Sequence, residues 1–169
     1  MTKPPNQCTK GFTLIELIVT VTILAVLASA AMPMLQMSVK RNKENELRAN
    51  LRQIREAIDA YKKAADDGRI KKSIEETSYP PDLAVLVNGV TDEKDANKNK
   101  IKFLRRIPLD PMSPVDINVA NENTDELPSN WGLRSYQSDA NNPTQGSDVF
   151  DIYSQSQQVG INGVPYAKW

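Results

Sequence analysis

An uncharged, apolar stretch near the start of the chain constrains the fold more than any other feature. The run from Leu17 to Leu35 carries no formal charge, and it is about as long as the roughly 20 residues that a membrane-spanning helix needs. Glu16 directly precedes it. A carboxylate near the apolar region of a bilayer costs about 2–3 kcal/mol on insertion scales and is usually paired. No Lys or Arg lies within one helical turn on the apolar side, so the partner must come from elsewhere.

Two ordinary explanations of this stretch leave something unexplained. A secretory signal peptide has an apolar region of only about 7–15 residues, which is shorter than this run, although the letters ASAAM resemble a cleavage site. A plain signal anchor fits the length, but it gives no reason for Glu16.

The letters KGFTLIE, which span Lys10 to Glu16, resemble the processing site of type IV prepilins and type II secretion pseudopilins. In that superfamily a membrane peptidase cuts after a glycine, here Gly11, and the new terminal residue, here Phe12, is N-methylated. The resemblance implies that residues 1–11 are a leader that is removed. It also implies that Glu16 is the glutamate characteristic of the superfamily.

The charges of the new N-terminus and of Glu16 fit this resemblance. Cleavage creates a cationic α-amine on Phe12, and Glu16 of one subunit can then face the Phe12 amine of the next. Burying two opposite charges together is far less costly than burying either alone, so the pair would also fix the axial register of an assembly. Residues 12–35 are therefore predicted to be a transmembrane and assembly helix, which lipid surrounds before assembly.

Pro33 is the third candidate assembly residue. A proline cannot donate a hydrogen bond to the Ser29 carbonyl, so it should kink or loosen the helix there. The resemblance implies that the segment stretches when subunits pack into a filament, whereas a tolerated membrane proline is the alternative.

The helical pattern continues past the apolar run. One apolar stripe recurs at spacings of three and four residues, the repeat of a single helix face; it consists of Leu47, Leu51, Ile54, Ile58 and Tyr61. We predict one helix from about Thr13 to Asp66, roughly 80 Å long, stopped at Gly68. Residues 36–68 would pack on the chain's own globular part, with a short coiled coil as the alternative. Glu44–Arg48 and Asp59–Lys63 are expected to form ion pairs one turn apart.

Residues 69–169 are predicted to form the globular head. A short helix is expected at residues 79–89, a solvated loop at 91–100 and an extended connection at 103–112. Strands are expected in WGLRSYQS and DVFDIYSQS, where Phe150 and Ile152 would face the core and Asp151 water. Trp131, Tyr153, Tyr166 and Trp169 are expected to be core aromatics. The fold class is thus α+β, a long N-terminal helix on a small head with a short antiparallel sheet.

Two head segments narrow the resemblance to the major pseudopilin of type II secretion. They are a YP-x-x-L-x-x-LV helix and a following L-R-R-I-P-x-DP connection, and the matching positions are Tyr79, Pro80, Leu83, Leu86, Val87, Leu104, Arg105, Arg106, Ile107, Pro108, Asp110 and Pro111. Type IV pilins usually end in a disulfide-closed loop. The one cysteine, Cys8, lies in the leader, so the mature chain cannot form that loop.

The composition argues against catalysis and against nucleic-acid binding. The chain has no histidine, which excludes Ser-His-Asp chemistry and the commonest zinc sites. Its 21 basic and 21 acidic residues balance, unlike the basic surface of most nucleic-acid proteins. No catalytic residue is predicted, and an anchored periplasmic enzyme is disfavoured relative to an anchored binding module.

No cofactor is predicted either. The resemblance implies calcium bound by acidic residues of the last loop, but residues 154–169 contain no Asp or Glu, and calcium usually takes several oxygens that include carboxylates. Asp139, Asp148 and Asp151 are the alternative candidates, although such aspartates more often serve turns and strand edges.

The function that the resemblance implies is a pseudopilin subunit of a short periplasmic filament that drives protein export. Its implied partners are further copies, the prepilin peptidase, inner-membrane secretion platform proteins and minor pseudopilins. A type IV pilus fibre subunit for adhesion, motility or DNA uptake is the alternative. The implied location is the bacterial inner membrane, single-pass, with a periplasmic head. Basic residues after the apolar run, such as Lys40 and Arg41, predict the opposite orientation, but the processing motif is the more specific signal.

Overall fold

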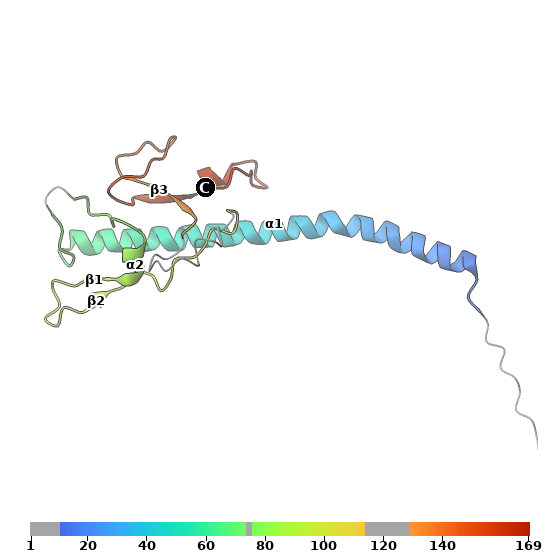
Figure 1. The fold of residues 1–169 in the computed structure, drawn as a ribbon, viewed down its shortest axis with the longest axis horizontal. Coiled ribbons are helices and arrows are strands. Elements are labelled where there is room, and N and C mark those ends of the chain that lie inside the picture. Colours follow the sequence, from blue (N-terminus) through green and yellow to red (C-terminus); the bar gives the residue numbers. More distant parts are fainter. Residues whose placement is uncertain (1–10, 74–75, 114–128) are drawn as a thin grey trace, which may run out of the picture. The chain divides into compact units, whose positions relative to one another are not determined.

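A computed structural model describes residues 11–73, 76–113 and 129–169 of the chain. The chain divides into two compact units, Met1–Lys40 and Arg41–Trp169, and the first helix contributes to both. The elements, in chain order, are α1 (Leu14–Asp66), α2 (Ala84–Asn88), β1 (Val90–Thr91), β2 (Lys100–Ile101), β3 (Trp131–Arg134), β4 (Asp151–Ser154) and the short 3-10 helix η2 (Tyr166–Lys168). The predicted α+β class is confirmed, and Figure 1 shows these elements along the chain.

Helix α1 confirms the single long helix predicted from the apolar periodicity. It spans 53 residues and contains Pro33. Gly68 ends it as predicted, with a φ of +70°, a left-handed conformation that glycine adopts without strain. The amide of Arg69 donates to the Ala64 carbonyl at 2.9 Å, so the last turn is closed by the chain that follows it.

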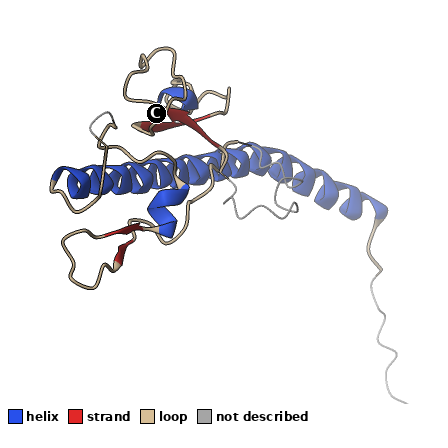
Figure 2. Ribbon diagram, turned by 60° about the vertical axis from the view of Figure 1, so that its left-hand side comes forward, coloured by secondary structure: helices blue, strands red, loops and turns tan. Residues whose placement is uncertain are grey.

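The second half of α1 is the central element of the head. Its predicted stripe is buried, with Leu47 and Ile54 fully inaccessible to solvent, and it joins one core cluster with residues of the remaining head: Ile70, Leu83, Leu86, Leu104, Ile107, Trp131, Val149, Ile152 and Tyr166. Burying each large apolar side chain contributes about 1.5–3 kcal/mol. In Figures 1 and 2 this half of α1 runs between α2 with the β1–β2 pair on one side and β3 on the other. Packing on the chain's own head, rather than a coiled coil, is therefore what the stripe does.

The head contains two separate two-stranded antiparallel sheets in the described residues. Strand β3 pairs with β4 in the register Trp131↔Ser154 to Arg134↔Asp151, which confirms both predicted strands in shortened form. The second sheet pairs β1 with β2, and these strands flank the loop that we predicted at residues 91–100. Residues 92–99 form a turn with mostly exposed side chains, as predicted, whereas Thr91 and Lys100 belong to the strands. The turn is ordered by its own side chain, because the Asp95 carboxylate accepts hydrogen bonds from the Asn97 amide and the Asn99 side chain.

Helix α2 is shorter than the predicted segment at residues 79–89. Pro80 lies outside it, because its carbonyl accepts the Val149 amide at 2.8 Å and so serves the approach to β4. The helix begins at Ala84, and just before it the Asp82 carboxylate accepts the Val85 amide at 2.9 Å. Gly89 ends it as predicted, with a φ of +79°.

Three expectations about charged side chains were wrong. Asp151 does not face water alone, because it forms ion pairs with Arg55 at 2.8 Å and Arg134 at 3.2 Å. Among the described residues, Glu44 forms no ion pair with Arg48, and Asp59 forms none with Lys63. The ion pair found one turn apart near the end of α1 is Lys62–Asp66. Glu44 is instead turned into the core, where it is 5% exposed.

The predicted inward faces are confirmed in part. Ile152, Trp131 and Tyr166 are buried, whereas Tyr153 and Trp169 are half-buried at the edge of the core. Phe150 is also half-buried, and its ring contacts that of Tyr79 edge-to-face, with centroids 5.1 Å apart.

Candidate assembly site

The predicted processing site lies just before α1. Residues 11–13 have no regular structure and are exposed, with Phe12 71% accessible. The space around Gly11 is open, because an added Cβ would meet no atom within 4 Å. Exposed, irregular backbone of this kind is where peptidases cut most readily, so the Gly11–Phe12 bond is accessible in the isolated chain.

Glu16 lies in the first turn of α1. Its amide donates to the Thr13 hydroxyl at 3.3 Å, which places Thr13 in the role of a helix cap. A carboxylate in the first turn is favoured by the helix dipole. Glu16 is exposed, and within the described part of the chain no ion pair involves it. Its carboxylate is therefore open to a cation from another molecule.

The first half of α1 exposes a continuous apolar surface. In the described chain α1 is the one helix that is long and apolar enough to cross a membrane, and none of its apolar window is buried. Its large exposed side chains include Leu14, Ile15, Leu17, Ile18, Val19, Val21, Ile23, Leu24, Val26 and Leu27. A surface of this extent needs a cover of lipid or of other helices.

Three hydroxyl groups in this half are satisfied by the helix itself. The Thr20, Thr22 and Ser29 hydroxyls donate to the carbonyls of Leu17, Ile18 and Val26, at 2.9, 2.7 and 2.8 Å. Such back-bonding keeps hydroxyls compatible with an apolar surrounding. Pro33 lies within the helix without ending it, although it removes one backbone donor.

The three aspartates considered for calcium are already engaged with protein donors. Asp148 is buried and accepts hydrogen bonds from the hydroxyls of Ser135 and Thr77 and from the Tyr136 amide. Burial alone would raise the pKa of the Asp148 carboxyl, but these hydrogen bonds hold it below its ordinary value of 3.8.

The other two candidates do not complete a metal site with Asp148. Asp151 is paired with its two arginines, and Asp139 is exposed and accepts the Asn141 amide at 2.8 Å. In the ranges that the structure describes, no group of three or more His, Cys, Asp or Glu side chains is placed to hold a metal ion. The calcium that the resemblance implies also does not fit residues 155–169, which contain no carboxylate side chain.

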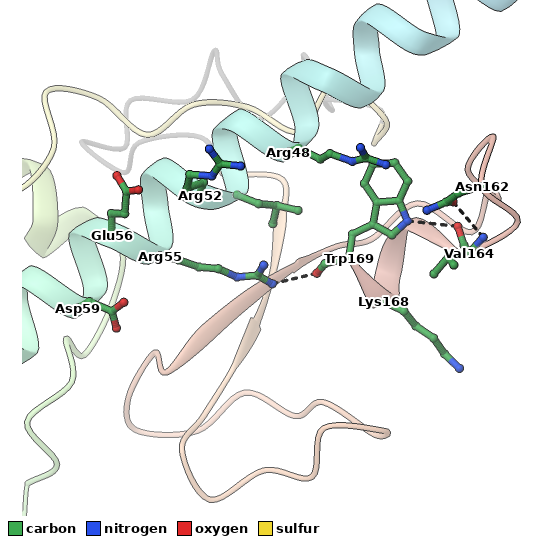
Figure 3. Close-up of a pocket in the computed structure, with 10 residues that line it drawn as sticks. Arg48, Arg52, Arg55, Glu56, Asp59, Asn162, Val164, Lys168 and Trp169 are labelled. Carbon is green, nitrogen blue, oxygen red and sulfur yellow. Dashed lines mark hydrogen bonds between the residues drawn. The ribbon is translucent and has the colours of Figure 1, made fainter.

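A cleft of about 520 Å³ lies between α1 and the end of the chain. Figure 3 shows Arg48 over the Trp169 ring and Arg55 reaching the Trp169 carbonyl, at 4.4 Å to the ring centroid and 2.9 Å respectively. Glu56 and Asp59 line the same cleft, so its charges are mixed. Local sequence pattern carries no signal for these contacts, because they join residues more than one hundred positions apart.

Comparisons with known proteins give one sequence motif and three relatives that share a name. Residues 6–32 match the prokaryotic N-terminal methylation motif. Three relatives, each named type II secretion system core protein G, come from Pseudomonas aeruginosa (30% identical over 105 residues, 60% of this chain and 66% of the relative), Vibrio cholerae (26% over 149 residues, 75% and 94%) and Klebsiella pneumoniae (30% over 109 residues, 62% and 70%). No solved structure gives a significant match.

A membrane-length apolar helix that starts in a methylation motif and continues into the core of a small α+β head defines a pilin-like subunit. The chain belongs to the type II secretion system core protein G family, whose members are pseudopilins.

Proposed function

We propose that this chain is a filament-forming pseudopilin that acts by assembly rather than by catalysis. After cleavage between Gly11 and Phe12, the subunit rests in the inner membrane with its head in the periplasm. It then packs helix against helix into a short filament that drives protein export. The prepilin peptidase, minor pseudopilins and the membrane platform of the secretion machine are its proposed partners.

The observation that carries this proposal is the environment of Glu16. Its carboxylate borders a wholly exposed apolar surface and is in no ion pair within the described chain. In a filament the α-amine of a neighbouring Phe12 supplies the missing cation. The pair then offsets the cost of burying each charge among apolar helices.

The first test is the chemistry of the mature N-terminus. Mass spectrometry of the protein purified from membranes of cells that contain its peptidase should give a chain that starts at N-methylated Phe12. A chain that starts at Met1 would contradict the proposal, because no terminal amine would then lie near Glu16.

The second test is a Glu16→Ala variant. We expect processing and membrane insertion to continue but filament formation, scored by crosslinking between neighbouring subunits in the cell envelope, to be lost. Thr20→Ala is a suitable control, since its hydroxyl bonds only within the helix. Normal filaments from the Glu16→Ala chain would refute the charge pairing. Long extracellular fibres from the unaltered chain would instead favour the type IV pilus alternative.

A further inference from the structure

The last part of the chain, residues 155–169, is ordered with little regular structure. Its backbone folds back on itself, with the Gly160 amide donating to the Val164 carbonyl at 2.9 Å and the Tyr166 amide to the Gln158 carbonyl at 3.1 Å. These internal bonds shape the segment, but they do not attach it to the head. The attachment must come from other residues.

Glu44, on α1, supplies the central attachment. One of its carboxylate oxygens accepts the Ile161 amide at 2.7 Å and the Tyr166 hydroxyl at 2.9 Å. Hydrogen bonds to a charged acceptor are roughly twice as strong as neutral ones. A single carboxylate oxygen therefore binds both Ile161 and the buried residue Tyr166.

Tyr166 is well suited to this contact. Its side chain is fully buried, and burial, together with the adjacent Glu44, raises the pKa of the phenol to about 12. The hydroxyl therefore remains a donor throughout the pH range in which the protein is handled.

Two arginines of α1 hold the end of the same segment. Arg48 lies over the Trp169 ring, and Arg55 donates to the Trp169 carbonyl and to the Asp151 carboxylate. We call Glu44, Arg48, Arg55, Tyr166 and Trp169 the latch.

We propose that the latch orders residues 155–169 without a metal ion, so that this protein folds independently of calcium. A calcium ion needs six to eight oxygen ligands, usually with several carboxylates. The segment offers no Asp or Glu side chain, and the Oε1 atom of Glu44 is already shared by two protein donors. This inference concerns the head alone and does not depend on filament assembly.

The direct test uses the unaltered full-length chain in detergent. Its thermal midpoint, followed by tryptophan fluorescence, should be the same in millimolar calcium chloride and in excess chelator. A midpoint that rises with calcium and falls with the chelator would overturn the proposal, whatever the behaviour of any variant.

A second test identifies Glu44 as the residue responsible. In Glu44→Ala, amide hydrogen exchange at Ile161 and Tyr166 should be faster by roughly tenfold or more, as expected for losing a charge-assisted hydrogen bond. Tyr166→Phe removes one of the two donors and should give a smaller increase at Ile161. The matched control is Glu46→Ala, since Glu46 is an exposed glutamate two positions away. Equal exchange at Ile161 in the Glu44 and Glu46 variants would refute the assignment.

Discussion

Residues 14–39 and 41–66 belong to one uninterrupted helix, yet their apolar side chains have opposite environments. Every described side chain of the first half is exposed, whereas Leu47, Ile54 and their neighbours in the second half are buried in the head. The first half is apolar on all faces and the second on one stripe, the two patterns that distinguish a helix surrounded by apolar partners from one at a protein surface. The second half thus builds the head, and the first is left for lipid or other subunits.

The largest difference between the two halves is expected when one isoleucine in each is replaced by alanine and the stability of the head is measured. Ile54→Ala removes a fully buried side chain and should lower the free energy of unfolding of the head by about 2–5 kcal/mol, the range for such core truncations. Ile23→Ala, in the exposed half, should leave it unchanged. Denaturant titration of head tryptophan fluorescence in detergent measures both. Similar losses from the two variants would mean that the halves do not differ as described.

Acid should weaken the head through Asp148. Because hydrogen bonds lower the pKa of Asp148 in the folded state, its contribution is present above the unfolded value of about 3.9 and is lost as the pH falls through the folded value. Asp148→Asn should be less stable at neutral pH by about 1–3 kcal/mol.

The same variant should also show a flatter stability curve below pH 4, because it lacks the titrating group. Unfolding monitored from pH 7 to pH 2 for both chains tests this. Parallel curves would show that Asp148 does not titrate as proposed.

The smallest change in head stability is expected from a substitution on the solvent-exposed side of the second half of α1. Lys62 and Asp66 form an ion pair at 2.5 Å, but both side chains are more than one-third exposed, and such surface pairs contribute little. Lys62→Ala should leave the thermal midpoint of the head nearly unchanged. A loss comparable to that of Ile54→Ala would show that α1 is held by surface charge as much as by its stripe.

Local sequence pattern was enough to predict the helix, its end and the two main strands. The stripe from Leu47 to Tyr61 repeats within one element, and glycine readily adopts the left-handed conformation that ends a helix at Gly68. Both features could therefore be recognised from the local sequence. The start of α2 was misplaced because the carbonyl of Pro80 bonds Val149, a distant residue. The β1–β2 pair was missed because the side chain of Asp95, rather than an apolar alternation, orders its turn.

The candidate site was predictable only where it is a contiguous motif. Gly11, Phe12 and Glu16 follow one another closely in the sequence, so the resemblance of the letters KGFTLIE was enough to propose them; their roles in processing and assembly stay a prediction. Glu44 was expected to pair with Arg48 one turn away. Its actual partner, Tyr166, lies 122 positions along the chain, and no local spacing encodes such a contact.

Buried carboxylates have one more consequence for the head. Glu44, Asp110 and Asp148 each join segments distant in sequence: Glu44 binds Tyr166, Asp110 binds Ser154, and Asp148 binds Thr77. These cross-links perform the task that cystine bridges have in many small exported domains. The chain has a single cysteine, so no thiol oxidation is required to close them. The head should therefore reach its native form equally well under reducing and oxidising conditions, without help from disulfide-forming enzymes.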